Sequence, residues 1–312
     1  MFIAKGHKVS TVLKYAGIAS SSWYYHQKEK NDDNRIENAG RPVPGYTVNP
    51  DGEIIPDSLI IKALTSYRHN KNFSNGGGYH KLSRYLRRDF GYYVNDKKVY
   101  RLCKENNLLL PQKKKTRKRK SKLSSNVEVK MANHLWELDI KYGYICGENR
   151  FFYIMIIIDV YLRYIVGYHI GLRCTGKDLA FTLKTAIDKY CSHHESNGQT
   201  LYVRSDNGTQ MTSNAFVESF KSYSEKSVVH ELIPYATPNK NAHVESFNSI
   251  LEIEFMQPRY FWSYSQAYSE TVDFIYFYNN ERIHGALNNN TPNEMMTLAR
   301  EGKELPIKSV RA

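Results

Sequence analysis

The stretch "RFFYIMIIIDVY" runs from Arg150 to Tyr161 and is apolar at almost every position. A nearly continuous apolar strand is typical of the centre of a sheet that is covered on both faces. The run is too short to cross a membrane and it carries Asp159. We therefore place it in the core of a folded domain.

Two further strands are predicted beside this run. The segment "WELDIKYGYI" (136–145) alternates between apolar residues on one side and polar residues, among them Asp139, on the other. The segment "YIVGYHIGL" (164–172) follows the central run after a short turn. Three adjacent strands with tight connections predict an antiparallel meander.

Helices and strands alternate after the meander. We expect an amphipathic helix over 176–190, a strand over 201–208, a helix over 214–223 and a strand over 227–234, then a helix within 237–255. The order β-β-β-α-β-α-β-α predicts an α/β fold in which a mixed sheet is flanked by helices. That order matches a ribonuclease-H-like fold.

The chain before this domain predicts small all-α regions. Residues 9–25 indicate two short helices, and 57–110 indicate three, the last of them capped by Asn95. A short helix, a glycine-containing turn and a basic capped helix suggest a helix-turn-helix-like unit, with an ordinary three-helix bundle as the alternative. The predicted divisions are an N-terminal helical segment (1–26), a linker (27–56), a helix-turn-helix-like domain (57–111), a basic linker (112–130), the α/β domain with a C-terminal helix (131–300) and a tail (301–312).

The charge of the chain points to a polyanionic partner. The net charge is +13 and the pI is about 9.3, so neutralising phosphates would release counterions. We expect the basic residues of the third helix to lie on its outer face and contact DNA. A basic tract between the domains could also follow a phosphate backbone, although a solvated linker or a localisation-like tract is an equal alternative. The predicted contacts are Lys97, Lys98 and Arg101 in the helix and Lys113, Lys114, Lys115, Arg117, Lys118, Arg119 and Lys120 in the tract.

The remaining composition fits a protein that works inside the cell. The four cysteines lie far apart and have no zinc-ligand spacing, so we expect reduced thiols. The first ten residues lack the core and cleavage site of a signal peptide, and we expect neither export nor a membrane association.

Acidic residues on the α/β domain suggest a metal site. Asp139 lies on a strand, Asp206 stands before an Asn-Gly turn, and the last helix carries Glu245, Glu252 and Glu254. Each has an ordinary structural explanation when taken alone. Together, three carboxylates offer the oxygen ligands that Mg²⁺ prefers, and such a set can hold two ions about 4 Å apart.

Helix geometry sorts the three glutamates only in part. At about 100° per residue, Glu254 points nearly opposite Glu245 and cannot serve from the same face. Glu252 points almost the same way as Glu245, but two turns separate them by about 10 Å. Only one of the two can therefore belong to the site, and geometry leaves Glu245 and Glu252 as alternatives.

Four motifs resemble those of a known enzyme family. "WELDIKY", "RSDNGTQMTS", "NAHVESFNSILEIEF" and "FYNNERIHGALNNNTPNEM" occur in the order found in OrfB-type transposases of the insertion-sequence-three family. These are DDE recombinases related to retroviral integrases, and the segment "GYHKLSRYLRRDFGYYVNDKKVYRLCKENNLL" is similar to their helix-turn-helix-like region. The resemblance implies an integrase catalytic core in which Asp139, Asp206 and Glu245 are the catalytic and metal-binding triad.

The resemblance also implies the chemistry. We expect cleavage at the ends of an insertion sequence with two Mg²⁺ ions, for which Mn²⁺ can substitute, and strand transfer by attack of a 3′-hydroxyl on a phosphodiester. Expected partners are the terminal inverted repeats, target DNA, further copies of the chain on DNA, and an upstream-frame protein or fusion. The expected location is the bacterial cytoplasm, at the nucleoid.

Two departures from the family pattern bear on DNA binding. Lys240 stands where an aspartate is common, and Glu252 stands where relatives often have a DNA-facing base. We hypothesise that Lys240 takes over that contact. Arg282, in the closing motif, is a second candidate for a DNA contact, with docking of a C-terminal helix as its alternative role.

Two other functions are compatible with the sequence. One is a ribonuclease-H-like nuclease that cuts DNA without joining it. The other is a non-catalytic DNA-binding regulator derived from a transposase.

Overall fold

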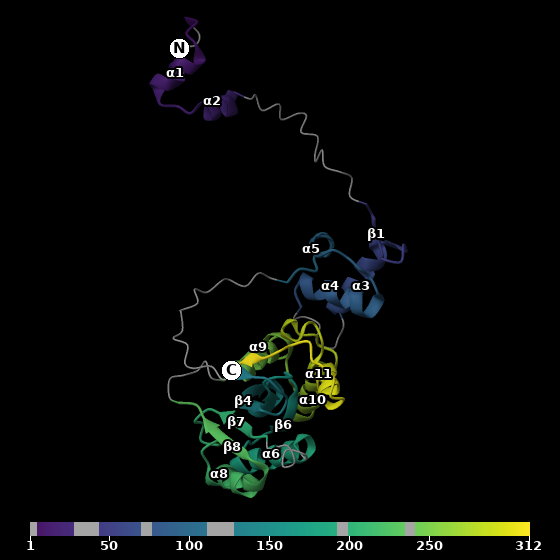
Figure 1. Cartoon of the computed structure of the whole chain (residues 1–312), viewed down its shortest axis with the longest axis vertical. Coiled ribbons are helices and arrows are strands. Elements are labelled where there is room, and N and C mark those ends of the chain that lie inside the picture. Colours follow the sequence, from purple (N-terminus) through teal and green to yellow (C-terminus); the bar gives the residue numbers. More distant parts are fainter. Residues whose placement is uncertain (1–4, 28–43, 70–76, 111–127, 192–198, 235–240) are drawn as a thin grey trace. The chain divides into compact units, whose positions relative to one another are not determined.

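The computed structural model describes residues 5–27, 44–69, 77–110, 128–191, 199–234 and 241–312 (Figure 1). The chain forms two compact units, Met1–Gly45 and Tyr46–Ala312. The first unit contains α1 (Val9–Ala16) and α2 (Ser20–Gln27), which confirms the two predicted short helices. Gly17 ends α1 in the left-handed conformation, with a φ of 65°, which glycine adopts without steric cost.

The second unit begins with a hairpin and three helices. The hairpin consists of β1 (Tyr46–Val48) and β2 (Ile54–Pro56), which pair antiparallel. The linker predicted over 27–56 is therefore wrong at its carboxyl end, because Ile55 packs in the core of the helical domain. The alternation over so short a strand is obscured by the surrounding Asn, Asp, Gly and Pro residues.

The three predicted helices of the helical domain are confirmed. They are α3 (Asp57–His69), α4 (Tyr79–Phe90) and α5 (Asp96–Glu105). The Asn95 side chain caps α5 by accepting a hydrogen bond from the Lys97 amide at 2.9 Å. Their shared core buries Ile60, Leu64, Leu82, Leu86, Val99 and Leu102.

A five-stranded mixed sheet forms the centre of the second domain, as predicted. Its spatial order is β6 (Ile165–Gly171), β5 (Arg150–Asp159), β4 (Leu135–Ile145), β7 (Leu201–Ser205) and β8 (Val228–Leu232). The first three strands pair antiparallel, while β7 runs parallel to β4 and β8 parallel to β7. The predicted meander is thus the antiparallel half of the sheet.

Both faces of β5 are buried because helices cover both sides of the sheet (Figure 1). Ile154, Ile156 and Ile158 pack with α9 (Ala242–Ile250) and α10 (Tyr264–Asn280). Met155 and Ile157 pack on the other face with α6 (Gly176–Tyr190) and α8 (Asn214–Ser219). The continuous apolar run is therefore divided between two cores by the alternation of a strand.

The helix predicted within 237–255 differs from the structure in its second half. Regular α-helix ends at Ile250, and the chain continues as a π-helical segment, Leu251–Met256. Residues 237–240 of that prediction lie outside the described residues. The wider turn changes the direction of side chains after Ile250, so the 100° spacing applies only to α9 itself.

The carboxyl terminus packs on the sheet domain. It includes α11 (Pro292–Arg300) and β9 (Val310–Arg311), which pairs antiparallel with β3 (Glu128–Val129). The predicted tail (301–312) and the end of the predicted basic linker (112–130) are corrected by this pairing. Among the described residues, no helix is both long and apolar enough to span a membrane.

Candidate active site

Three acidic residues are carried by three neighbouring elements. Asp139 lies on β4, and Asp206 directly follows the last residue of β7, so the prediction that Asp206 is itself a strand residue is off by one. Leu138 is the register partner of Ser205 in the parallel β4–β7 pair, which places both aspartates at the same level of the sheet. Glu245 lies in the first turn of α9, which packs against the same strand.

The charges of Asp206 and Glu245 act on Asp139. Burial, together with the charges of Asp206 and Glu245, raises the pKa of Asp139 to about 6, against a hydrogen bond from the Ile140 amide. Burial also raises the pKa of Glu245. A buried carboxyl group whose ionisation neighbouring acids disfavour is a setting in which a divalent cation binds.

The donor set fits a magnesium site in its chemistry. All three candidate ligands are carboxylates, the hard oxygen donors that Mg²⁺ selects. Across the described ranges, no three His, Cys, Asp or Glu side chains already converge in coordinating geometry. The fit to Mg²⁺ therefore rests on the chemistry of the three side chains.

An asparagine that the sequence motifs did not single out orients Asp139. The Asn248 amide donates to Asp139 Oδ2 at 2.6 Å, and the Ile140 amide donates to Oδ1 at 2.8 Å. Asn248 follows Glu245 by three residues and thus shares its side of α9. This spacing of three residues was the sequence signal that could have pointed to Asn248. Each bonded carboxylate oxygen retains a lone pair that can bind a metal.

The loop after β7 orients Asp206 in a similar way. The Gly208 amide donates to Asp206 Oδ1 at 2.9 Å. A Cβ atom at position 208 would lie 3.0 Å from that oxygen, which is closer than ordinary contact. The Asn-Gly pair therefore lets the backbone approach and hold the carboxylate.

Glu254 and Glu252 have different partners. Glu254 is buried and receives two hydrogen bonds from the Arg282 guanidinium, at 2.6 and 2.8 Å. The prediction that Glu254 faces away from Glu245 rested on the 100° spacing, which does not hold in the π-helical segment that carries Glu254. Glu252 is half-buried and pairs with Lys141 Nζ at 2.9 Å, two residues along β4 from Asp139.

The closing motif serves the packing of the core. Arg282 is only 7% exposed and is committed to Glu254, which leaves no open guanidinium face for a DNA contact. The Asn279 side chain bonds both the amide and the carbonyl of Ile165 on β6, at 3.0 and 3.1 Å. We assign Arg282 the structural role that was its alternative in the sequence analysis, and Asn279 likewise serves packing.

His243, which lies two residues before Glu245, is also held by the fold. Its ring contacts the Arg163 guanidinium and the carbonyl oxygen of Arg311, the latter at 3.1 Å. Burial, together with the charge of Arg163, lowers the pKa of His243 to about 4. The ring is therefore neutral near pH 7 and ties α9 to its neighbours.

The basic residues predicted on α5 divide into two groups. Lys97 is exposed, as predicted. Lys98 pairs with Asp57 at 2.6 Å, and Arg101 pairs with Asp57 and with Glu105, at 3.1 and 3.0 Å. The outer-face prediction is wrong for Lys98, whose side chain is only 17% exposed. The other predicted DNA contacts, Lys113, Lys114, Lys115, Arg117, Lys118, Arg119, Lys120 and Lys240, lie outside the described residues.

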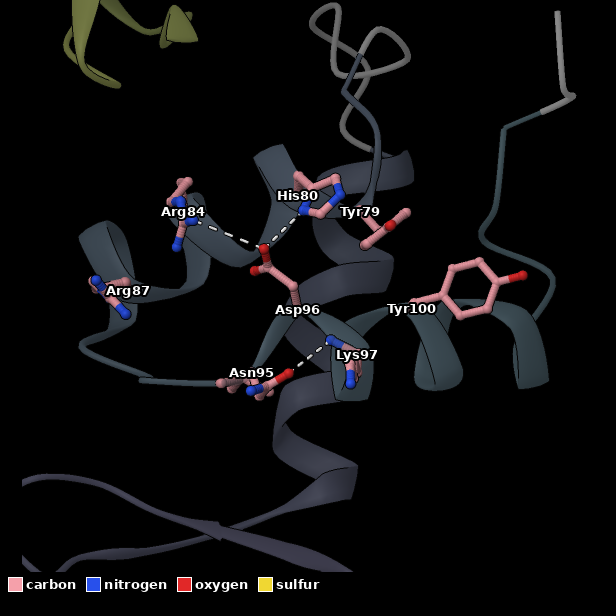
Figure 2. A pocket seen from close by; sticks show the side chains of 9 residues that line it. Tyr79, His80, Arg84, Arg87, Asn95, Asp96, Lys97 and Tyr100 are labelled. Carbon is pink, nitrogen blue, oxygen red and sulfur yellow. Dashed lines mark hydrogen bonds and ion pairs between the residues drawn. The ribbon is translucent and has the colours of Figure 1, made fainter.

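A hollow of about 660 Å³ lies where α4 meets the first turn of α5, as Figure 2 shows. Asp96 stands at its centre, 2.7 Å from the His80 ring and 3.8 Å from the Arg84 guanidinium. The Arg87 guanidinium lies near the hollow and over the Tyr93 ring, 4.6 Å from its centroid. The rest of the lining is basic and aromatic, with Tyr79, Lys97 and Tyr100.

Comparisons with known families agree with this arrangement. Residues 129–231 and 226–292 match two integrase core domain families, which together span more than half of the chain. Residues 71–116 match an HTH-like domain. The first match contains Asp139 and Asp206, and the second contains Glu245.

Relatives come from bacterial insertion elements. The chain is 27% identical to an uncharacterised protein of insertion element IS476 of Xanthomonas euvesicatoria, over 67% of this chain and 57% of the relative. It is 24% identical to an uncharacterised protein of IS407 of Burkholderia multivorans, over 87% and 92%. It is 28% identical to the transposase for IS904 of Lactococcus lactis, over 52% and 60%. The chain thus spans little more than half of the first and third relatives.

Similar solved structures include the HTLV-2 integrase catalytic core domain in complex with magnesium, at 15% identity and a TM-score of 0.38 over 53% of this chain and 96% of that one. The BIV integrase catalytic core domain matches at 16% identity and a TM-score of 0.39, over 55% and 97%.

The family matches and the mixed sheet define this chain as a DDE-type protein with an integrase core. More closely, the chain carries an HTH-like match ahead of that core and is similar to proteins of bacterial insertion elements, one of them a transposase, so the resemblance seen in the four sequence motifs is confirmed.

Proposed function

We propose that this chain cleaves DNA at the ends of an insertion sequence and joins the freed 3′-hydroxyl to another phosphodiester. The observation that supports this most is the placement of Asp139, Asp206 and Glu245. Three elements of an integrase core bring these acids within electrostatic reach of each other. The charges of Asp206 and Glu245 raise the pKa of Asp139, which supports assigning the three acids to one site.

The residues of the site would hold divalent cations. Two Mg²⁺ ions, when bound, would supply activation of the attacking oxygen and stabilisation of the leaving oxygen. Asp139, Asp206 and Glu245 would bind them, and Mn²⁺ could substitute. Asn248 and the Gly208 amide keep two of these carboxylates oriented before any ligand arrives. A related integrase core was solved in complex with magnesium, which is in keeping with this proposal.

The helical domain would bind the DNA. Its HTH-like match, and the basic and aromatic lining of the hollow between α4 and α5, support contacts to phosphates and bases. We expect the DNA to be the terminal inverted repeats of the element and its target, bound by several copies of the chain. An upstream-frame protein or fusion is a further expected partner, and the site of action would be the nucleoid in the cytoplasm.

The experiment is a joining assay with labelled element ends, a second DNA and Mg²⁺. The proposed function predicts labelled products longer than the substrate. Three variants test the acids: Asp139→Asn, Asp206→Asn and Glu245→Gln. Each should lower the cleavage rate roughly 10³-fold, which corresponds to a loss of about 4 kcal/mol of transition-state stabilisation, while DNA binding persists.

Two results would count against the proposal. Cutting without longer products would favour the nuclease alternative, and binding without cutting would favour the regulator. Full joining by Asp206→Asn would remove that residue from the site.

A further inference from the structure

A buried glutamate and a buried arginine lie next to the acids, at matching positions on β4 and β7. Glu137 precedes Asp139 by two residues on β4, and Arg204 precedes Asp206 by two residues at the end of β7. The two are register partners in the parallel β4–β7 pair. Glu137 is fully buried and Arg204 is 1% exposed. Because side chains two residues apart point to the same face of a strand, Glu137 and Asp139 lie on the same face of β4.

Glu137 also contacts the third acid-bearing element. Its Oε2 atom accepts hydrogen bonds from the amides of His243 and Val244, both at 2.9 Å. These two amides belong to the first turn of α9 and directly precede Glu245. The first amides of a helix have no partner within it. The side chain of Asn241, the residue at the cap position, does not bond them.

Glu137 therefore caps α9 from a neighbouring strand. A carboxylate at a helix amino terminus satisfies free amides and interacts favourably with the helix dipole. On its other side, Glu137 Oε1 lies 4.0 Å from Arg204 Nη1, and Arg204 Nε reaches Glu231 on β8 at 3.1 Å. One network thus connects the three elements that carry Asp139, Asp206 and Glu245.

We propose that Glu137 is a positioning residue that fixes the placement of the three metal-binding carboxylates by capping α9 from β4. This inference rests on the proposed function, since it assumes that the three acids bind metal. Glu137 itself is buried and would touch neither metal nor DNA. Its effect comes from the two hydrogen bonds, which oppose sliding or rotation of α9 against the sheet.

Two conservative substitutions separate the effect of the length of the Glu137 side chain from the effect of its charge. Glu137→Gln keeps an oxygen that can accept from both amides but loses the charge. Glu137→Asp keeps the charge but withdraws the oxygen by one methylene, and the strand ladder prevents the backbone from following. If the hydrogen bonds position α9, Glu137→Asp should weaken metal binding about 10-fold, whereas Glu137→Gln should stay within about threefold of wild type.

The measurement is titration calorimetry of the full chain with Mn²⁺, followed by the Mg²⁺ dependence of joining. Glu148→Asp is the matched control, because Glu148 Oε1 accepts from the Tyr264 amide at the start of α10, at 2.7 Å, away from the acids. If Glu137→Asp and Glu148→Asp only destabilised the fold, both would have lower melting temperatures. The Mn²⁺ affinity of the folded protein would then stay unchanged.

The outcomes are distinct. Wild-type Mn²⁺ affinity in Glu137→Asp, or an equal loss in Glu137→Gln, would overturn the positioning role while the proposed function stands. If wild-type protein neither binds Mn²⁺ nor joins DNA, the proposed function fails and this inference fails with it.

Discussion

The charged residues singled out in the sequence have different surroundings in the catalytic domain and in the helical domain. In the catalytic domain, Asp206 and Glu245 raise the pKa of Asp139 from two other elements. In the helical domain, Lys97 and Lys98 are adjacent in sequence, yet one is exposed and the other pairs with Asp57. The difference shows that a charged residue's role depends on the partner that the fold supplies, because an ion pair formed within the protein withdraws a charge from the surface.

Replacing Arg282 should have the largest effect on the free energy of unfolding, because its partner Glu254 is buried. Replacing Arg282 with Leu would leave Glu254, 4% exposed, without its guanidinium. Breaking a buried pair in this way should lower the free energy of unfolding by about 3–5 kcal/mol. Thermal or urea unfolding of the full chain would measure it.

The double variant Arg282→Met with Glu254→Leu is the control for that result. Replacing both partners with apolar residues of similar volume is often near neutral, so it should recover most of the lost stability. An Arg282→Leu protein that unfolds like wild type but loses DNA affinity would instead restore the predicted DNA contact of Arg282.

The helical domain should show an intermediate effect, on DNA affinity. Arg84, Arg87 and Lys97 line the hollow in Figure 2. Alanine at these three positions should weaken binding of element ends. Each phosphate that a variant no longer neutralises should reduce the slope of log K against log salt by about 0.9, because fewer counterions are released. Mobility-shift titrations at several salt concentrations would measure both quantities.

Lys104 and Lys98 provide matched controls on the same helix. Lys104→Ala removes an exposed charge from the last turn of α5, away from the residues that line the hollow, and should leave the salt slope unchanged. Lys98→Ala should act mainly on stability, because it removes the pair with Asp57. A slope that changes equally in all these variants would mean that binding follows net charge and not this surface.

The sequence predicted the sheet well because its signals are local. The apolar run around Ile156 and the alternation around Asp139 each specify a strand without knowledge of the rest of the chain. The hairpin at Ile55 and the pairing of Val129 with Val310 were missed, since each depends on contacts between short segments. The π-helical turn after Ile250 was missed as well, because the apolar spacing continued through it.

Sequence motifs proposed the acids of the candidate site but not the residues that hold them in place. Family motifs selected Asp139, Asp206 and Glu245, whereas periodicity alone left Glu252 as an alternative to Glu245. Glu137 had appeared only as a polar strand residue, and its contact with the amides of α9 joins positions more than a hundred residues apart. No local pattern encodes such a contact, because it follows from the packing of α9 across β4.

Replacing Glu252 should give the smallest effect on stability and on metal binding. Its size decides whether Glu245 or Glu252 is the third metal ligand. Its pair with Lys141 joins side chains that are 36% and 32% exposed. Pairs of this kind contribute under about 1 kcal/mol, so Glu252→Gln should change the unfolding free energy by no more than that. If Glu245 is the third ligand, Glu252→Gln should also keep Mn²⁺ affinity and joining within about threefold of wild type. Glu245→Gln in the same calorimetric and joining assays should lose both. The reverse pattern would assign the ligand to Glu252, and would require the π-helical turn to unwind so that its carboxylate leaves Lys141 for the aspartates.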